Sequence, residues 1–142
     1  MRIGFTGTRK GMNYIQSLKL QEMLRFDYDN VTEFHHGDCV GCDDNFDQLA
    51  RYHLGETLIV IHPPKSVKYR AFCDRRDGNT RVEQEYGYLE RNRHIVDSSD
   101  VLIAVPNSFE EQERSGTWMT VRYARKRHKP VVVIFSDGTV LR

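Results

Sequence analysis

Two short segments in the second half of the chain have the composition of an anion-binding site. Arg91-Asn92-Arg93 lies near the end of a predicted helix, and Ser115-Gly116-Thr117 follows the apolar strand predicted at Val101–Val105. A Ser-Gly-Thr turn that opens a helix leaves several backbone N–H groups without intrahelical acceptors, and such groups bind anions. Cations before the strand and free amides after it predict a phosphorylated ligand.

Length and charge set the class of protein. The chain has 142 residues and a net charge of +1, which is typical of one globular domain, here residues 1–142, with no overall field that attracts nucleic acid or membranes. It contains no apolar run near the roughly 20 residues that span a bilayer and no signal-peptide pattern at its N-terminus. We therefore expect a soluble cytoplasmic protein without a membrane partner.

The chain has three cysteines, and this odd number argues against the disulfide framework of a secreted protein. Cys39 and Cys42 form a C-x-x-C pair, which is found in zinc and redox sites. Zinc needs two further ligands, and the remaining candidates are scattered: Cys73, His35, His36 and His62. We interpret the pair as part of a loop that requires small residues, and we expect neither a metal nor a cofactor.

Strand and helix patterns alternate along the chain. Strands are predicted at Arg2–Thr6, Val31–His36, Thr57–Ile61, Val101–Val105, Val131–Phe135 and, after a turn, Thr139–Leu141. Helices are predicted from about Met12, from a cap at Asp43 or Asp44, from about Arg81 to Val96, and over Ser115–Arg127. This alternation predicts an α/β fold with a mainly parallel sheet of about five strands.

Two regions depart from simple periodicity. In the first helix the apolar residues are Ile15, Leu18, Leu20, Met23 and Leu24, which we expect to face the core. The segment from His62 to Thr80 has no clean period and is rich in charged residues. Connections of this length are uncommon in compact domains and are usually functional or mobile.

The loops after the predicted strands are rich in glycine, hydroxyl and polar residues. In a parallel sheet, ligands bind beyond the carboxyl ends of the strands, where the strand order reverses. The four loops are Thr6–Arg9, Gly37–Gly41, His62–Pro64 and Pro106–Ser108, and Gly7 and Gly11 would let the backbone approach a ligand closely. Ordinary turns in any α/β protein have the same composition, so this pattern alone leaves both interpretations open.

Four motifs taken together resemble the DprA/Smf family of the SLOG superfamily. Gly7-Thr8-Arg9 resembles its G-S/T-R, and His36–Asp43 is similar to its S-G-G-A-x-G-x-D loop. Arg91-Asn92-Arg93, ahead of Asp100, resembles R-N-R-x-I-x-x-x-S-D, and Ser115–Ala124 resembles S-G-S/T-x-x-T-x-x-x-A. The motifs occur in the family's order between Ile3 and Ile134.

The resemblance implies a Rossmann-like three-layer sandwich that binds a nucleotide or nucleotide-derived ligand. The phosphate would lie on the helix start at Ser115-Gly116-Thr117, with Arg9 and Arg91, and the ribose or base near Asp38 and Asp43. The same site would include five further residues: Gly7, Thr8, Gly37, Asn92 and Arg93. The first hypothesis is therefore a sensor or sequestering protein for such a ligand.

An enzymatic alternative comes from the LOG-type phosphoribohydrolases of the same superfamily, which cleave the N-glycosidic bond of a nucleoside monophosphate. Arg91 aligns with their catalytic arginine, but the position of their glutamate is Thr120, and two glycines of their loop are Asn107 and Ser108. A substitute carboxylate could come from the following loop, which contains Glu110, Glu111 and Glu113. Whether the chain is an enzyme stays open at this stage, with an N-glycosidase as the alternative.

A third hypothesis, less favoured than a small-molecule ligand, is DprA-like binding of single-stranded nucleic acid. The aromatic residues for base stacking would be Tyr69, Phe72, Tyr86 and Tyr88. The basic run at Arg122, Arg125, Lys126, Arg127 and Lys129 is better explained as the solvated end of a helix, where cations complement the helix dipole. Homo-oligomers are common in the family, so we include self-association among the expected partners.

Overall fold

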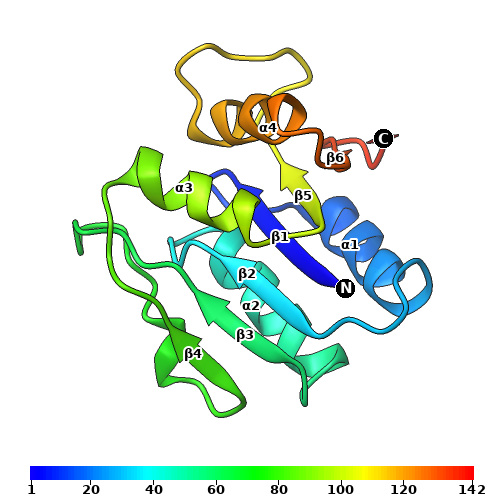
Figure 1. Cartoon of the computed structure of the whole chain (residues 1–142). Helices are drawn as coiled ribbons and strands as arrows, with labels where there is room; N and C mark the ends of the chain where they lie inside the picture. Colours follow the sequence, from blue (N-terminus) through cyan, green and yellow to red (C-terminus); the bar gives the residue numbers. More distant parts are fainter.

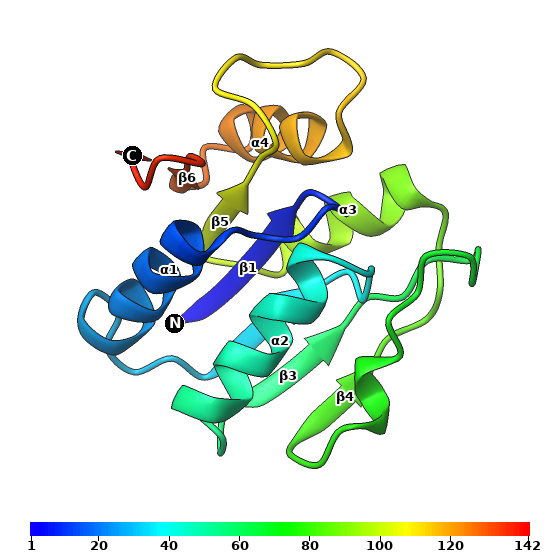
Figure 2. The ribbon, with the colours of Figure 1, turned by 180° about the vertical axis from the view of Figure 1, so that it is seen from behind.

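The computed structural model covers residues 1–142 and has three layers, with a sheet between two pairs of helices (Figure 1). In chain order the elements are β1 (Arg2–Gly7), α1 (Tyr14–Phe26), β2 (Glu33–His36), α2 (Cys42–His53), β3 (Leu58–Ile61), the 3₁₀ turn η1 (Cys73–Arg75), β4 (Thr80–Val82), α3 (Tyr88–Asp97), β5 (Val101–Val105), α4 (Gly116–Lys126), β6 (Val131–Ile134) and β7 (Val140–Leu141). Helices α3 and α4 cover one face of the sheet, and α1 and α2 cover the other (Figure 2). The predicted α/β sandwich is confirmed.

The seven strands follow the order β4-β3-β2-β1-β5-β6-β7. All neighbours are parallel except β6 and β7. From β1 the chain builds outward through β2, β3 and β4, and it then returns through α3 to place β5 on the opposite side of β1. The order therefore reverses between β1 and β5, which is where a crevice for a ligand forms in this class of fold.

The segment between β3 and α3 differs from its prediction. It contains η1 and the strand β4, and the helix expected from Arg81 begins only at Tyr88. Residues Thr80–Val82 pair with Ile59–Ile61 of β3, so tertiary strand pairing decides the conformation of a stretch too short to show a period. The sheet consequently has seven strands rather than about five.

Each face of the sheet has its own apolar core. Under α1 and α2, the Phe5 and Phe46 rings stack with their centroids 4.3 Å apart, and Phe34 meets Phe46 edge-on. Under α3 and α4, the core centres on Ile95 and Trp118. Nothing in these helices is both long and apolar enough to cross a bilayer.

The first turns of helices α1 and α2 differ from the predictions. In α1, Ile15 and Leu18 are exposed, whereas Gln16 is buried and donates to the Ile134 carbonyl, so the buried stripe begins later than expected. In α2 neither Asp43 nor Asp44 is the cap, because Gly41 holds that position with φ of 91° and no side chain caps the helix. A Cβ atom at Gly41 would lie 2.2 Å from the Arg9 carbonyl oxygen, so the close approach of these two loops requires glycine.

Candidate functional site

A cavity of about 430 Å³ opens at the carboxyl ends of β1 and β5, where the strand order reverses. Nine of the twelve predicted site residues line it: Gly7, Thr8, Arg9, Asp43, Arg91, Asn92, Ser115, Gly116 and Thr117. Lys10, Cys39, Tyr88, Asn107, Gln112 and Arg114 also contribute to its wall. Gly37, Asp38 and Arg93 do not line it.

The start of α4 supplies hydrogen-bond donors to this cavity. Ser115 is the N-cap, and its Oγ accepts from the Trp118 N–H at 3.3 Å. The N–H groups of Gly116 and Thr117 have no acceptor within the protein. Because both residues line the cavity, two free amides and the positive end of the helix dipole lie at its wall.

Three cations without carboxylate partners surround these amides. Arg9, Lys10 and Arg114 line the cavity, and none of them forms an ion pair. The Arg9 guanidinium stacks between two rings, 4.1 Å from the centroid of Tyr69 and 5.1 Å from that of Tyr88. Stacking holds the plane of the guanidinium while its N–H edges stay available to an anion.

Arg91 lines the cavity, but most of its N–H donors are used in hydrogen bonds within the protein. Its side chain is only 4 % exposed, and its Nη1 donates to the carbonyl oxygens of Gly37 and, at 3.2 Å, of His62. Its Nε donates to Asn92 at 2.8 Å. Arg91 therefore ties the loops after β2 and β3 to α3, and Gly37 leaves room for it, because a Cβ there would lie 2.5 Å from Nη1.

Asp43 is the one carboxyl group that lines the cavity. It is 7 % exposed, and one of its oxygens accepts from the Cys39 N–H at 3.1 Å. Burial raises the pKa of Asp43, against the nearby charges of His36 and Arg91, which lower it. The cavity thus combines N–H donors and cations with a single acidic group.

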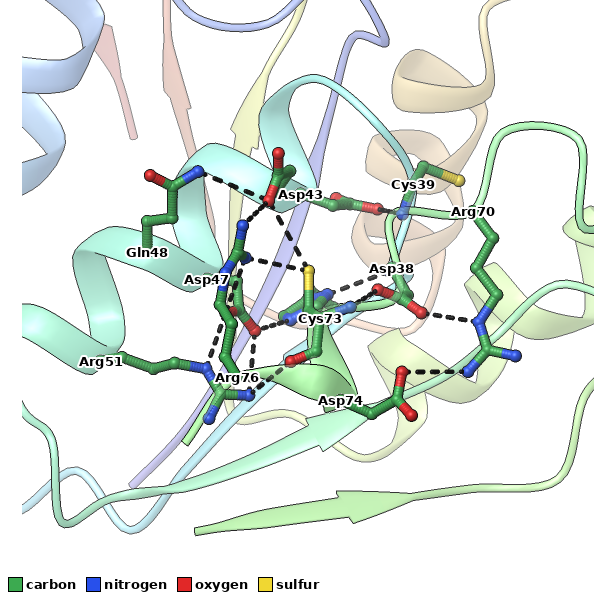
Figure 3. Close-up of polar contacts among 12 residues, drawn as sticks. Asp38, Cys39, Asp43, Asp47, Gln48, Arg51, Arg70, Cys73, Asp74 and Arg76 are labelled. Carbon is green, nitrogen blue, oxygen red and sulfur yellow. Dashed lines mark hydrogen bonds and ion pairs between the residues drawn. The ribbon is translucent and has the colours of Figure 1, made fainter. Parts of the chain in front are cut away.

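The structure places Asp38 outside the cavity, although it was expected near the ribose or base. Asp38 is fully buried, and its carboxylate accepts from Arg70 Nε at 2.8 Å and from the Cys73 N–H at 2.9 Å (Figure 3). Its carbonyl oxygen accepts from the Ala71 N–H, and the neighbouring Val40 donates to the Tyr69 carbonyl. Asp38 thus anchors the segment that brings Tyr69 to Arg9.

A second buried polar cluster, which contains Asp47, also holds this segment. Asp47 accepts from His36 at 2.8 Å, from Arg51 at 2.7 Å and from Arg76 at 3.1 Å (Figure 3). His36, Asp47 and Cys73 are close enough to share a metal ion. However, Arg76 also donates to the Cys73 sulfur at 3.2 Å, so two guanidinium groups neutralise the cluster and explain it without a cation.

The glutamates considered as substitutes for a catalytic carboxylate do not reach the cavity. Glu111 pairs with Arg125 and lies 3.8 Å from Arg122. Glu110 is exposed, and Glu113 lines a separate groove between α3 and α4. Thr120, at the position of the LOG-type glutamate, faces that same groove, and its hydroxyl donates to the Gly116 carbonyl at 2.8 Å.

Arg93 is exposed and also lines the second groove, with its guanidinium 5.4 Å from the Tyr123 ring. The two C-x-x-C thiols are free and separate in role. Cys39 lines the cavity, and Cys42 opens α2 within the core. Burial raises the pKa of Cys42 to about 12, which disfavours a thiolate there.

Sequence reasoning missed Lys10, Arg114 and the Asp47 cluster. Lys10 and Arg114 directly adjoin the Gly7–Arg9 and Ser115–Thr117 motifs, so their charges were a usable signal. The Asp47 cluster gave little signal, because two of the three partners of Asp47, His36 and Arg76, lie 11 and 29 residues away in sequence, and only Arg51 lies one helical turn away.

Comparison with known proteins gives structural matches. No protein-family model and no curated protein sequence matches the chain. A structural-genomics protein named TM1055 is 15 % identical, with a TM-score of 0.59 over 92 % of this chain and 71 % of its own. The molybdenum cofactor binding protein of Rippkaea orientalis is 22 % identical, with a TM-score of 0.65 over 94 % and 76 %.

DNA processing protein A of Streptococcus pneumoniae is 20 % identical, with a TM-score of 0.66 over 93 % of this chain and 49 % of its own. The chain therefore spans about half of that protein. These matches show that the chain has the Rossmann-like fold of these three proteins, in agreement with the fold that the four motifs imply.

Proposed function

We propose that the protein binds a nucleotide or nucleotide-derived phosphorylated ligand in the cavity between β1 and β5, as a sensor or sequestering protein. The observation that carries the proposal is the pair of free amides at Gly116 and Thr117 beside three unpaired cations. Free helix-start amides and unpaired cations are the groups that bind phosphate, and together they favour an anion of more than one charge.

The remaining wall suits the rest of a nucleotide. The volume of about 430 Å³ lies in the range of small-molecule sites. Tyr88 offers a ring, and Asp43 and Asn92 offer acceptors for ribose hydroxyl or base N–H groups. Two structural neighbours are named for binding a molybdenum cofactor and for processing DNA.

Gly116→Pro is expected to weaken binding of a nucleoside monophosphate roughly tenfold without loss of stability. Gly116 is the first residue of α4, and proline at that position removes only the free N–H while fitting the helix. Ser115 already has the extended conformation that precedes proline well, with φ of −73° and ψ of 126°. Titration calorimetry measures the affinity, and thermal unfolding checks the fold.

Gly116→Ala is the matched control, because a Cβ there meets nothing within 4 Å and the N–H is retained. We expect this variant to bind like the original protein. Equal affinities of the proline and alanine variants would show that the ligand does not use this amide. If no member of a nucleotide panel bound at all, the proposed function would be rejected.

A second candidate function is hydrolysis of the N-glycosidic bond of a nucleoside monophosphate, and Asp43 favours it. This carboxyl group is the one acidic side chain in the cavity, and burial raises its pKa, which favours uptake of a proton. In such a reaction water adds to the anomeric carbon as the C–N bond breaks. The base then leaves with the proton that Asp43 has taken from the water.

If the enzyme hypothesis holds, Asp43→Asn is expected to reduce release of free base by about 100-fold or more while nucleotide binding persists. Asn keeps the volume and an oxygen acceptor for the Cys39 N–H, so the loop is preserved. Asp44→Asn, the neighbour that does not line the cavity, should leave the rate unchanged. Chromatographic detection of free base decides, and no release by the unmodified protein at high concentration would exclude the hydrolase.

A further inference from the structure

A second groove of about 570 Å³ adjoins the cavity on the face formed by α3 and α4. The two spaces share three residues: Tyr88, Asn92 and Gly116. Residues of α3 and α4 form most of the groove, namely Leu89, Arg93, Met119, Thr120, Arg122, Tyr123 and Lys126, with Glu113 from the preceding loop. A ligand bound at Gly116 can therefore extend directly from the cavity into the groove.

Two positive charges in this groove have no carboxylate partner in the protein. Arg93 from α3 and Lys126 from α4 form neither an ion pair nor a hydrogen bond. Neighbouring cations of α4 are engaged, since Arg125 pairs with Glu111. Arg122 also lines the groove, but it donates to the Glu113 carbonyl at 2.9 Å. Free charge is thus left where the two helices face each other.

Four apolar or aromatic side chains also line the groove. Leu89 is 51 % exposed and Met119 is 39 % exposed, and the Tyr88 and Tyr123 rings complete the lining. Exposed apolar side chains bordered by unpaired cations suit a planar, partly apolar group that carries negative charge.

We propose that the groove binds the second nucleotide unit of a dinucleotide whose first phosphate lies on the Gly116 and Thr117 amides. This inference rests on the proposed function, because it extends the ligand of the same cavity. The second base packs on Leu89 and Met119, and its phosphate lies near Arg93 and Lys126. The linkage between the units is either a phosphodiester, as in a nucleic-acid fragment, or a pyrophosphate, as in a dinucleotide metabolite.

The test compares three probes that contain the same base: a nucleoside monophosphate, a 5′-phosphorylated dinucleotide and a pyrophosphate-linked dinucleotide. The comparison is repeated for each of the common bases. One dinucleotide is expected to bind about tenfold or more tightly than the monophosphate, since a charged contact is added. Arg93→Ala and Lys126→Ala should each remove most of that gain and leave monophosphate affinity within about twofold. The linkage that gains more identifies the source of the ligand.

Arg125→Ala is the matched control, because it removes the same charge from α4 but does not line the groove. It should leave all three affinities unchanged. The inference is overturned if neither dinucleotide exceeds the monophosphate, if Arg125→Ala acts like the groove variants, or if Arg93→Ala weakens all three probes equally. Failure of the proposed function looks different, because then the monophosphate does not bind and Gly116→Pro has no effect.

Discussion

Asp47→Ala is expected to lower the free energy of unfolding by about 3–5 kcal/mol, the cost of removing one partner from a buried ion pair. Asp47 is fully buried and accepts from His36, Arg51 and Arg76 (Figure 3). Burial by itself would raise the pKa of Asp47, but hydrogen bonds from His36 and Arg51 bring it down to about 2. Without the carboxylate, Arg51 would lose its charge partner inside the fold, and Arg76 would keep only Asp44.

The consequence should extend to the binding site. Arg51 also donates to the carbonyl oxygens of Cys73 and Asp77, so Asp47 indirectly fixes the segment that carries Tyr69. We expect faster proteolysis between β3 and β4 in the variant, measured beside urea denaturation. Asp44→Ala is the control on the same helix, since its pair with Arg76 is partly exposed and should contribute under about 1 kcal/mol. Equal losses for the two variants would contradict the special role of Asp47.

The parts that were predicted correctly from sequence are those whose local pattern and tertiary role agree. Val101–Val105 is apolar throughout because both faces of β5 are covered, and its predicted bounds match the structure. Ser115 caps α4 as its residue type and position indicate. The loops at the carboxyl edge converge because parallel strands bring them there, which is why nine predicted site residues meet at one cavity.

The parts that could not be predicted depend on partners distant in the chain. Thr80–Val82 becomes a strand through β3, and Asp38 turns toward Arg70 and Cys73, 32 and 35 residues further on. A motif alignment places Asp38 in the ligand loop but does not show which way its side chain points. The groove between α3 and α4 was missed for the same reason, since the basic run at the end of α4 suggested only a solvated helix end.

The corrected role of Asp38 changes how the site is held together. The Asp38 carboxylate binds Arg70 and the Asp47 carboxylate binds Arg76, so the segment from Tyr69 to Arg76 is held at both ends. Tyr69 in turn stacks on Arg9. These two buried carboxylates therefore help to position the Arg9 cation in the cavity wall. Such a rigid arrangement keeps the Arg9 guanidinium oriented before a ligand arrives, which reduces the entropic cost of binding.

Acid is expected to destabilise the protein through His62. Burial, together with the charges of His35 and His36, lowers the pKa of His62 from its ordinary value of 6.5 to about 3. The His62 Nε2 lies 2.8 Å from the His35 Nδ1, and the His35 Nε2 lies 2.7 Å from Glu33. A neutral pair satisfies both contacts when His62 donates to His35 and His35 donates to Glu33, whereas charging His62 adds an unsolvated cation beside Arg91.

The sign of this effect follows from proton binding. Between pH 6.5 and about 3 the unfolded chain carries one more proton at His62 than the folded protein does. The stabilisation is therefore complete above pH 6.5 and decreases as the pH falls, by at most about 1.4 kcal/mol per pH unit. Asp47, with a pKa of about 2, adds its own loss only below its ordinary value of 3.8, so the two groups act in different pH windows.

His62→Gln isolates the histidine, because its amide can still donate to His35 but cannot take up a proton near neutral pH. Urea denaturation from pH 7 to pH 4 should show a shallower decline for this variant than for the original protein. His128→Asn, at an exposed turn with φ of 59° that asparagine tolerates, should keep the original slope. An unchanged slope in His62→Gln would mean that the acid sensitivity arises from another group. Asp43 does not affect the comparison, because it is present in all three proteins and its raised pKa acts in the opposite direction.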